Sequence, residues 1–328
     1  MQDLIRTLKS STRLVQKQYL AGLWKYFPLL PRIDGNDILL GDDAAAIKSG
    51  DGYLLLAAEG VYQPLLKSNP YLAGRTSVLT NVNDIYAMGG RPTALVDVLF
   101  SSTDESAREA LRGISDNANR YKVPVVGGHT TLEAECSSLS VFILGKANRL
   151  LSSFNAEADD DLLYISSFEG KYYPAFNFWD SSSGLAEKEL LAQLEILPEL
   201  AEEELADTAK DISMAGLIGS TLMMLESSKK GVVIYIDKIP THSQVPLQKW
   251  LLTFPSYGFI LSARPGKASD IKERFRKSGL VCETIGKVLP DNKVFFSDDR
   301  EKELFWDFDK EPLIGVSPTI STQVENGN

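Results

Sequence analysis

The 328-residue sequence has only two cysteines, Cys136 and Cys282, and neither belongs to a Cys-x-x-Cys motif. This excludes a cysteine zinc site and a disulfide framework, and it predicts two buried, reduced thiols. No apolar run approaches the roughly 18 uncharged residues of a membrane span. Residues 1–17 also lack the apolar core and the cleavage site of a signal peptide. These absences predict a cytoplasmic protein with no membrane partner.

Basic residues are in deficit, because 34 lysines and arginines face 44 aspartates and glutamates, for a net charge of −10. With no basic stripe and no interleaved aromatics, nucleic acid is not the expected partner. Anionic small molecules remain compatible with this charge, since Mg²⁺ can bridge acidic side chains to phosphates. The composition, 44% apolar and 24% charged, is that of a globular protein, and the length predicts about two domains.

Helix-like and strand-like hydrophobic periods alternate along the chain, which predicts an α/β (α+β) fold. Helices are expected at residues 2–27, 69–88, 104–121, 184–207, 214–226 and 267–277. Strands are expected at residues 38–40, 53–58, 94–100, 123–126, 139–144, 162–166, 232–236, 259–263, 281–288 and 293–296. The polar stretch 146–161 is the best boundary between two domains. The expected units are an N-terminal domain (1–150), a C-terminal domain (151–316) and a frayed tail (317–328).

Acidic and amide side chains that can bind a cation occur at three places in the first half. A turn that reads Gly-Asp-Asp-Ala-Ala-Ala-Ile contains Asp42 and Asp43, which can converge on one divalent ion. Asn81 and Asp84 are three residues apart on one face of an expected helix. Glu59 ends an expected strand. Taken alone, the Asp pair is more typical of a solvated turn and Glu59 of an ordinary strand-end acid, whereas Asn81 and Asp84 fit an exposed helix pair equally well.

Two further stretches combine glycines with polar side chains, as anion-binding loops do. In Val-Pro-Val-Val-Gly-Gly-His-Thr-Thr, backbone N–H groups after a strand can approach a phosphate, and the histidine can bind metal or phosphate. The residues concerned are Gly127, Gly128, His129 and Thr130. The other stretch, Asp-Ile-Ser-Met-Ala-Gly, leads into a helix whose N-terminus is a natural anion site. Structural roles stay open here: a satisfied histidine, and a helix N-cap at Asp211 or Ser213.

The order and spacing of these motifs resemble the superfamily of AIR synthase, thiamine-monophosphate kinase, the hydrogenase-maturation dehydratase and selenophosphate synthetase. The resemblance covers about residues 35–290, and its nearest match is an uncharacterised AIR-synthase-related protein. Its most specific part is Asn-Val-Asn-Asp-Ile-Tyr-Ala-Met-Gly-Gly-Arg-Pro, similar to the pattern N-x-x-D-x-x-A-M-G-x-x-P. It implies a two-domain AIR-synthase-like fold with ATP and Mg²⁺ in a cleft. The N-terminal sheet would pair into a barrel across a homodimer, and the C-terminal domain would be ferredoxin-like.

The resemblance also implies roles for particular residues. Those implied as metal ligands are Asp42, Asp43, Asp84, Glu59 and His129. Those implied to contact ATP are Asn81, Gly127, Gly128, Thr130 and Ser213. Those implied as catalytic residues are Asp84 and Asp211.

The chain departs from each named member at residues that the member's pattern contains. Met214 stands where the kinase pattern has a second aspartate, and the dehydratase's C-terminal cysteine has no counterpart. The expected function is therefore ATP- and Mg²⁺-dependent phosphoryl transfer to, or activation of, an oxygen of an unidentified small molecule. The alternatives are a catalytically silent nucleotide-binding scaffold, thiamine-monophosphate kinase, and a metal-binding protein without nucleotide.

Overall fold

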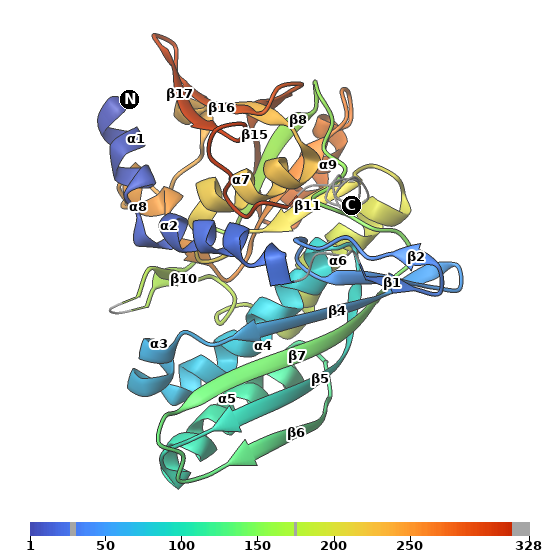
Figure 1. The fold of residues 1–328 in the computed structure, drawn as a ribbon, viewed down its shortest axis with the longest axis vertical. Coiled ribbons are helices and arrows are strands. Elements are labelled where there is room, and N and C mark those ends of the chain that lie inside the picture. Colours follow the sequence, from blue (N-terminus) through green and yellow to red (C-terminus); the bar gives the residue numbers. More distant parts are fainter. Residues whose placement is uncertain (27–30, 174–175, 317–328) are drawn as a thin grey trace.

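The computed structural model describes residues 1–26, 31–173 and 176–316. Two mixed sheets dominate the fold, one in each half of the chain, and helices lie between them (Figure 1). The expected tail (317–328) lies outside the described residues. None of the described helices combines the length and the apolar character that a membrane span requires.

The N-terminal sheet has five strands in the order β3-β4-β7-β5-β6. They are β3 (Ala45–Ser49), β4 (Gly52–Gly60), β7 (Ser138–Ala147), β5 (Arg91–Phe100) and β6 (Val125–Thr131). Neighbours are antiparallel except β5 and β6, which run parallel because α5 (Asp104–Arg120) connects them. Helices α5 and α4 (Pro70–Ala87) cover one face (Figure 1). The other face is open, and alternate residues on it, such as Leu56, Val96 and Phe100, are exposed.

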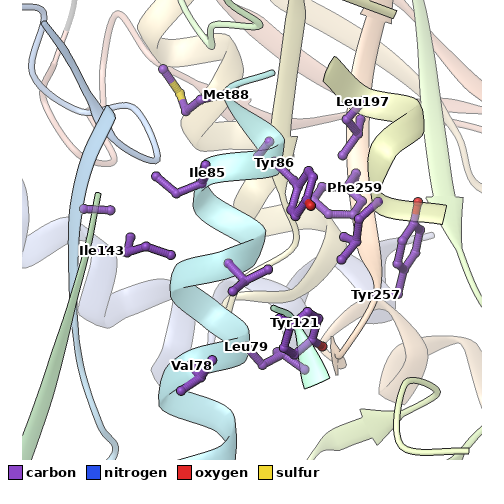
Figure 2. Close-up of a cluster of buried hydrophobic side chains, with 14 of the residues drawn as sticks. Val78, Leu79, Ile85, Tyr86, Met88, Tyr121, Ile143, Leu197, Tyr257 and Phe259 are labelled. Atoms are coloured by element: carbon purple, nitrogen blue, oxygen red, sulfur yellow. The ribbon is translucent and has the colours of Figure 1, made fainter. Parts of the chain in front are cut away.

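Helix α4 is buried on nearly all sides because it lies between the two sheets. Figure 2 shows Ile85 on the side that faces Ile143 of β7, whereas Tyr86 points toward Phe259 of the C-terminal half. The expected helix is confirmed: Asn69 caps it by accepting a hydrogen bond from the Leu72 N–H at 2.9 Å. The helix therefore joins both halves around one apolar core.

The C-terminal sheet has seven strands in the order β11-β14-β8-β15-β12-β16-β17. They are β11 (Thr208–Asp211), β14 (Gly258–Ala263), β8 (Asp161–Ser166), β15 (Val281–Leu289), β12 (Gly231–Tyr235), β16 (Lys293–Ser297) and β17 (Lys302–Asp307). The first four pair antiparallel, with α6 (Glu187–Glu202) between β8 and β11 and α9 (Ala268–Lys277) between β14 and β15. This matches the expected ferredoxin-like arrangement, extended at one edge by three strands. Helix α7 (Gly216–Ser228) follows β11.

Short elements complete the fold. The helices are α3 (Gln63–Ser68) and α8 (Leu247–Leu251). The strands are β1 (Arg32–Ile33), β2 (Asn36–Asp37), β9 (Lys171–Tyr172), β10 (Phe178–Asp180) and β13 (Phe254–Pro255).

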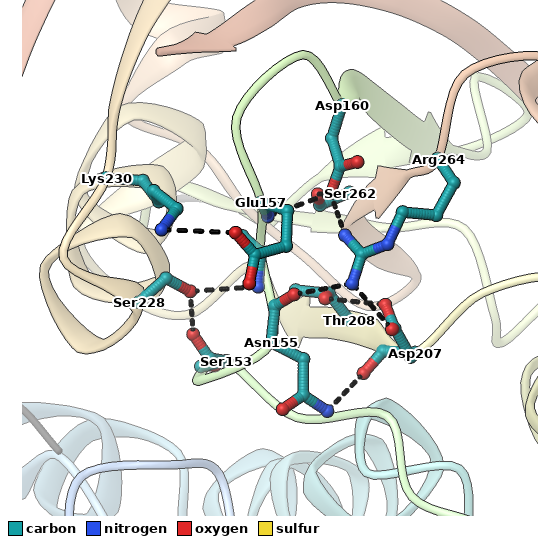
Figure 3. A network of polar contacts seen from close by, with 11 residues as sticks. Ser153, Asn155, Glu157, Asp160, Asp207, Thr208, Ser228, Lys230, Ser262 and Arg264 are labelled. Atoms are coloured by element: carbon teal, nitrogen blue, oxygen red, sulfur yellow. Dashed lines mark hydrogen bonds and ion pairs between the residues drawn. The ribbon is translucent and has the colours of Figure 1, made fainter. Parts of the chain in front are cut away.

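The polar stretch between the halves is an ordered connection (Figure 3). The fully buried carboxylate of Asp160 accepts hydrogen bonds from Ser262 and from the Arg264 guanidinium. Arg264 also bonds Asp207 at 2.8 Å, and the Ala156 N–H donates to Ser228 on α7. The connection is polar because its polar groups form hydrogen bonds with neighbouring strands and with α7. Composition alone cannot distinguish such a segment from a solvated linker.

The N-terminal segment differs from the single helix expected over residues 2–27. It contains α1 (Gln2–Lys9), α2 (Thr12–Gln18) and two 3₁₀ turns (Tyr19–Gly22 and Trp24–Tyr26). The break falls at Ser10 and Ser11, because serine favours helix ends over helix interiors. Residue 27 lies outside the described residues.

Several strand expectations differ from the structure, either in the bounds of the strand or in whether a strand is present. No regular strand covers 38–40, and the strand expected at 123–126 instead spans Val125–Thr131 as β6. Of the strands in the two main sheets, β3, β11 and β17 were not expected. Cys282 is buried as expected, but Cys136 is exposed because it lies in the loop between β6 and β7.

Candidate functional site

Three carboxylates from distant parts of the chain meet where the two halves join. Asp43 lies in the turn before β3, Asp84 in the last turn of α4, and Asp211 at the end of β11. Each offers one oxygen, and these oxygens lie within 4.8 Å of one another. The expected convergence of Asp43, Asp84 and Asp211 is therefore observed.

Backbone and side-chain hydrogen bonds hold this cluster. Asp43 Oδ2 accepts from the Asp211 N–H at 3.0 Å, and its Oδ1 accepts from the Lys210 ammonium. Lys210 is the preceding residue on β11, and its side chain is 5% exposed. Lys210 cannot be recognised from the sequence, since a lysine before an aspartate at a strand end carries no distinctive signal. The alternative that Asp211 or Ser213 caps α7 is wrong, because Ala215 occupies the N-cap position.

Burial and the neighbouring carboxylates raise the pKa of Asp84 and of Asp211. Burial raises the pKa of Asp84 well above its usual value, and the charges of Glu59, Asp211 and Asp43 add to the effect. Burial likewise raises the pKa of Asp211 well above its usual value, with Asp43 the next cause. Burial alone would lower the pKa of Lys210, but the carboxylates around it raise the value. A bound cation would relieve this repulsion.

Buried polar atoms at this site lack a hydrogen-bond partner among the described residues. Asp84 Oδ2 and Ser213 Oγ, whose residues line the pocket, are such atoms, and so is Asn81 Oδ1, three residues before Asp84 on α4. The amide nitrogen of Asn81 donates to the Ser77 carbonyl at 2.8 Å, which leaves its oxygen free. Because an unpaired buried oxygen costs about 1–3 kcal/mol, a ligand is the natural explanation. Oxygen donors suit Mg²⁺, so the residues present fit a hard divalent cation.

Asp42 and Glu59 lie near this cluster but outside the group of three. Asp42 Oδ2 accepts from Ser152 Oγ and from the Ser153 N–H, so its carboxylate is bound to the connection between the halves. Glu59, at the end of β4, faces the same pocket as the cluster. Burial raises the pKa of Glu59, while the Lys17 ammonium nearby lowers it.

The glycine-histidine motif lies far from the carboxylate cluster in the folded chain. The expected loop is part of strand β6, at the sheet edge opposite β3. Four strand spacings separate the two edges, about 19 Å at 4.8 Å each. His129 is exposed on the open face of the sheet, where its Nε2 is 3.0 Å from Thr131 Oγ1. Within one chain, therefore, the motif lies at the opposite sheet edge from the turn that holds Asp43.

A pocket of about 320 Å³ opens beside the carboxylates. One wall holds Asp43, Glu59, Asp84 and Asp211. Many of the other lining side chains are apolar, and helix α2 supplies Arg13 and Lys17. The volume falls in the range of small-molecule sites, and a few convergent polar groups in an apolar pocket are typical of them. The residues of α2 carry no functional signal in the sequence, because they follow an ordinary amphipathic pattern.

Comparison with known proteins is consistent with this arrangement. Residues 41–147 match the N-terminal domain, and residues 159–299 the C-terminal domain, of the family described as AIR synthase related protein. The uncharacterized protein sll0787 of Synechocystis is 44% identical over 285 residues, which cover 87% of this chain and 88% of that protein. The uncharacterized protein MJ0640 of Methanocaldococcus jannaschii is 38% identical over 246 residues, which cover 74% of this chain and 76% of that protein.

Solved structures share the fold at lower identity. Thermotoga maritima PurL complexed with ADP superposes with a TM-score of 0.72 at 20% identity over 91% of this chain. The chain spans only 49% of that PurL chain. AaThiL complexed with AMPPCP and TMP gives a TM-score of 0.60 at 20% identity, with 82% of this chain and 92% of that chain covered. The two domain matches together cover most of the chain, which therefore belongs to the AIR synthase related protein family and has its two-domain α/β fold.

Proposed function

We propose that the protein uses Mg²⁺-ATP to phosphorylate or activate an oxygen of a small molecule. The observation that carries the proposal is the cluster of Asp43, Asp84 and Asp211, with the unpaired Asp84 Oδ2, beside a pocket. The family to which the chain belongs includes ATP-using enzymes. The names of similar structures also support the proposal, because PurL is complexed with ATP in one and AaThiL with AMPPCP in another.

The residues of the site take different parts in this proposal. Asp43, Asp84 and Asp211 hold Mg²⁺, and Lys210 orients the Asp43 carboxylate. Bound Mg²⁺ supplies charge neutralisation on the phosphates, which is most of what phosphoryl transfer requires from a protein. Ser213 Oγ is buried and unpaired, so it is available to donate to a phosphate oxygen.

We also propose that two copies associate through the open face of the N-terminal sheet. Leu56, Val96 and Phe100 are 49%, 37% and 38% exposed there, which is unusual for alternate apolar residues of a sheet face. His129 pairs with Val98 on β5 and shares this face. A second copy is thus the proposed route by which His129 and the Gly127-Gly128 backbone contribute to a nucleotide site.

Two alternatives have specific support. The likeness to AaThiL complexed with AMPPCP and TMP favours thiamine-monophosphate phosphorylation, but Met214 of the pocket replaces an aspartate of the kinase pattern. The same replacement favours a nucleotide-binding scaffold without turnover.

The test measures ADP release from Mg²⁺-ATP with a panel of small acceptors, among them thiamine monophosphate, and nucleotide binding by thermal shift. Asp84→Asn is expected to abolish ADP release, whereas Glu135→Gln, an exposed acid in a loop, should retain it. Activity that survives Asp84→Asn would refute the proposed site. If ATP binds but no acceptor leads to ADP release, the scaffold alternative is favoured. If ATP causes no shift in the unfolding temperature, a metal-binding protein is favoured.

A further inference from the structure

The N-terminal segment forms one wall of the pocket, although both family domains follow it in the chain. The residues that face the pocket are Arg13, Lys17, Leu20 and Trp24. Their spacing of three or four residues places them on one side of α2 and the turns after it. Lys17 is close enough to lower the pKa of Glu59 and of Asp211. The segment thus reaches the carboxylate cluster with one turn and the apolar part of the pocket with others.

Arg13 has no carboxylate partner among the described residues. Its Nη1 donates to the carbonyl oxygens of Met214 and Leu252, each at 3.3 Å, which is long for such a bond. Burial lowers the pKa of the guanidinium, and Tyr62 acts in the opposite direction. A guanidinium offers five N–H donors in a planar fork that matches carboxylate and phosphate groups. A half-buried arginine that uses only one nitrogen is therefore suited to bind an anion from the pocket.

Aromatic side chains line the pocket together with Arg13. Asn177 donates from Nδ2 at 2.7 Å to the same Leu252 carbonyl oxygen that Arg13 contacts. The neighbouring Phe176 meets the Tyr62 ring edge-on, with centroids 6.5 Å apart. Tyr62 and Phe176 therefore line the same pocket as Arg13.

The apolar wall continues from this point into the pocket. The rings of Phe178 and Phe254 lie with centroids 5.3 Å apart, and both line the pocket. Leu65 and Leu72 line it as well. A flat apolar body would bury its surface against these side chains, at about 25 cal/mol per Å².

We propose that Arg13 binds the anionic group of the acceptor, a small carboxylate or phosphate ester whose apolar, ring-sized body packs on Phe176, Phe178 and Phe254. The proposal rests on the proposed function for the identity of the site. Arg13 is one helical turn from Lys17, a separation of about 6 Å between Cβ atoms. Lys17 lies beside the carboxylates, so a molecule held at Arg13 extends toward the bound phosphates. The pocket volume of about 320 Å³ limits the acceptor to a small molecule.

Calorimetric titrations without ATP test this assignment. The probes are benzoate, phenyl phosphate and the neutral analogue benzamide, and the variants are Arg13→Gln, Arg13→Lys and the control Arg6→Gln. Arg6 is an exposed arginine of the same segment. The wild type is expected to bind each anion about tenfold more tightly than benzamide, as for a charge-assisted hydrogen bond. Arg13→Gln should remove that preference, whereas Arg13→Lys should keep part of it and Arg6→Gln all of it.

Four outcomes would overturn the assignment. The first is equal binding of anion and benzamide by the wild type, and the second is a preference that survives Arg13→Gln. The third is a loss of all three probes alike in Arg13→Gln, which indicates that Arg13 only holds α2 in place. The fourth comes from a titration with Mg²⁺-AMPPCP. If Arg13→Gln weakens binding of this nucleotide as much as it weakens binding of the anions, Arg13 belongs to the nucleotide site instead. The two proposals can fail separately. A lack of anion preference would not change ADP release, and a lack of ADP release would not change the anion preference.

Discussion

Replacing Asp84 with asparagine should make the metal-free protein more stable while removing its response to Mg²⁺. Asp84 is 5% exposed, and one of its oxygens lies within 4.8 Å of oxygens of Asp43 and Asp211. Two unit charges at that distance repel by about 3.5 kcal/mol at an effective dielectric constant of about 20. Lys210 offsets part of this repulsion, and protonation relieves another part. We therefore expect Asp84→Asn to raise the unfolding free energy by about 1–3 kcal/mol.

The effect should depend on pH in a defined direction. The pKa of Asp84 is raised in the folded protein, so the native state binds more protons than the unfolded chain above the ordinary carboxyl pKa of about 3.9. The stability of the wild type therefore falls as pH rises through the folded-state pKa, and the advantage of the variant grows. Below the unfolded-state pKa, both forms of the wild type are protonated and the advantage disappears.

The assay is urea denaturation in EDTA and in excess Mg²⁺. Saturation at about one hundred times the dissociation constant should stabilise the wild type by about 2.7 kcal/mol and leave Asp84→Asn unchanged. The exposed Glu135→Gln should follow the wild type in both buffers. A variant that is less stable than the wild type in EDTA, or that gains as much from Mg²⁺, would refute the electrostatic reasoning.

Mg²⁺ affinity should increase with pH, by up to about tenfold per unit for each proton released, because protons compete with the ion at Asp84 and Asp211. Calorimetry across neutral pH checks this, and a flat profile contradicts it. Leu56→Glu places a charge on the open face of the N-terminal sheet, so sedimentation should show a monomer where the wild type is a dimer; a monomeric wild type would exclude the proposed dimer. A Cβ at Gly74 would lie 2.0 Å from the Ala110 carbonyl oxygen, so Gly74→Ala should separate α4 from α5. It should cost about 2–3 kcal/mol in denaturation, and an unchanged midpoint would contradict the tight packing.

Helix α4 shows what could be predicted from the sequence. Asn69 and Pro70 signal its start, and Gly89, with a φ of 73°, follows its end. These are local signals, so both the helix and the position of Asp84 in its last turn were predictable. The alternation of apolar residues likewise located most strands, to within a few residues at each end.

Strand β6 shows where prediction from the sequence fails. Two consecutive glycines favour a loop locally, yet Gly127 and Gly128 pair with Val96 and Asp97 of β5. A Cβ at Gly128 would lie 2.4 Å from Asp97 Oδ1, so the glycine is required for packing within the sheet. This neighbour comes from another strand, and no local pattern around residue 128 identifies it.

The choice between Asp42 and Asp43 also depends on distant residues. Adjacent aspartates in a turn have the same local signal, so the sequence predicts both as ligands. The structure separates them because Ser152 and Ser153 bind one carboxylate, whereas Lys210 and the Asp211 N–H hold the other. All of these partners are more than one hundred residues away, and only the packing of the two halves brings them together.

The charges that meet at the site give a physical reason for a divalent cation there. When ionised, Asp43, Asp84 and Asp211 carry three negative charges, and Lys210, whose side chain is 5% exposed, supplies one fixed positive charge. Among these four groups the excess is two negative charges in a buried place, which protonation and the nearby Lys17 ammonium relieve in part. An Mg²⁺ ion would balance that excess without a further side chain, whereas a second buried lysine would fill the space beside the pocket. The uncompensated charge is thus a consequence of the fold, and ligand binding is the means to remove it.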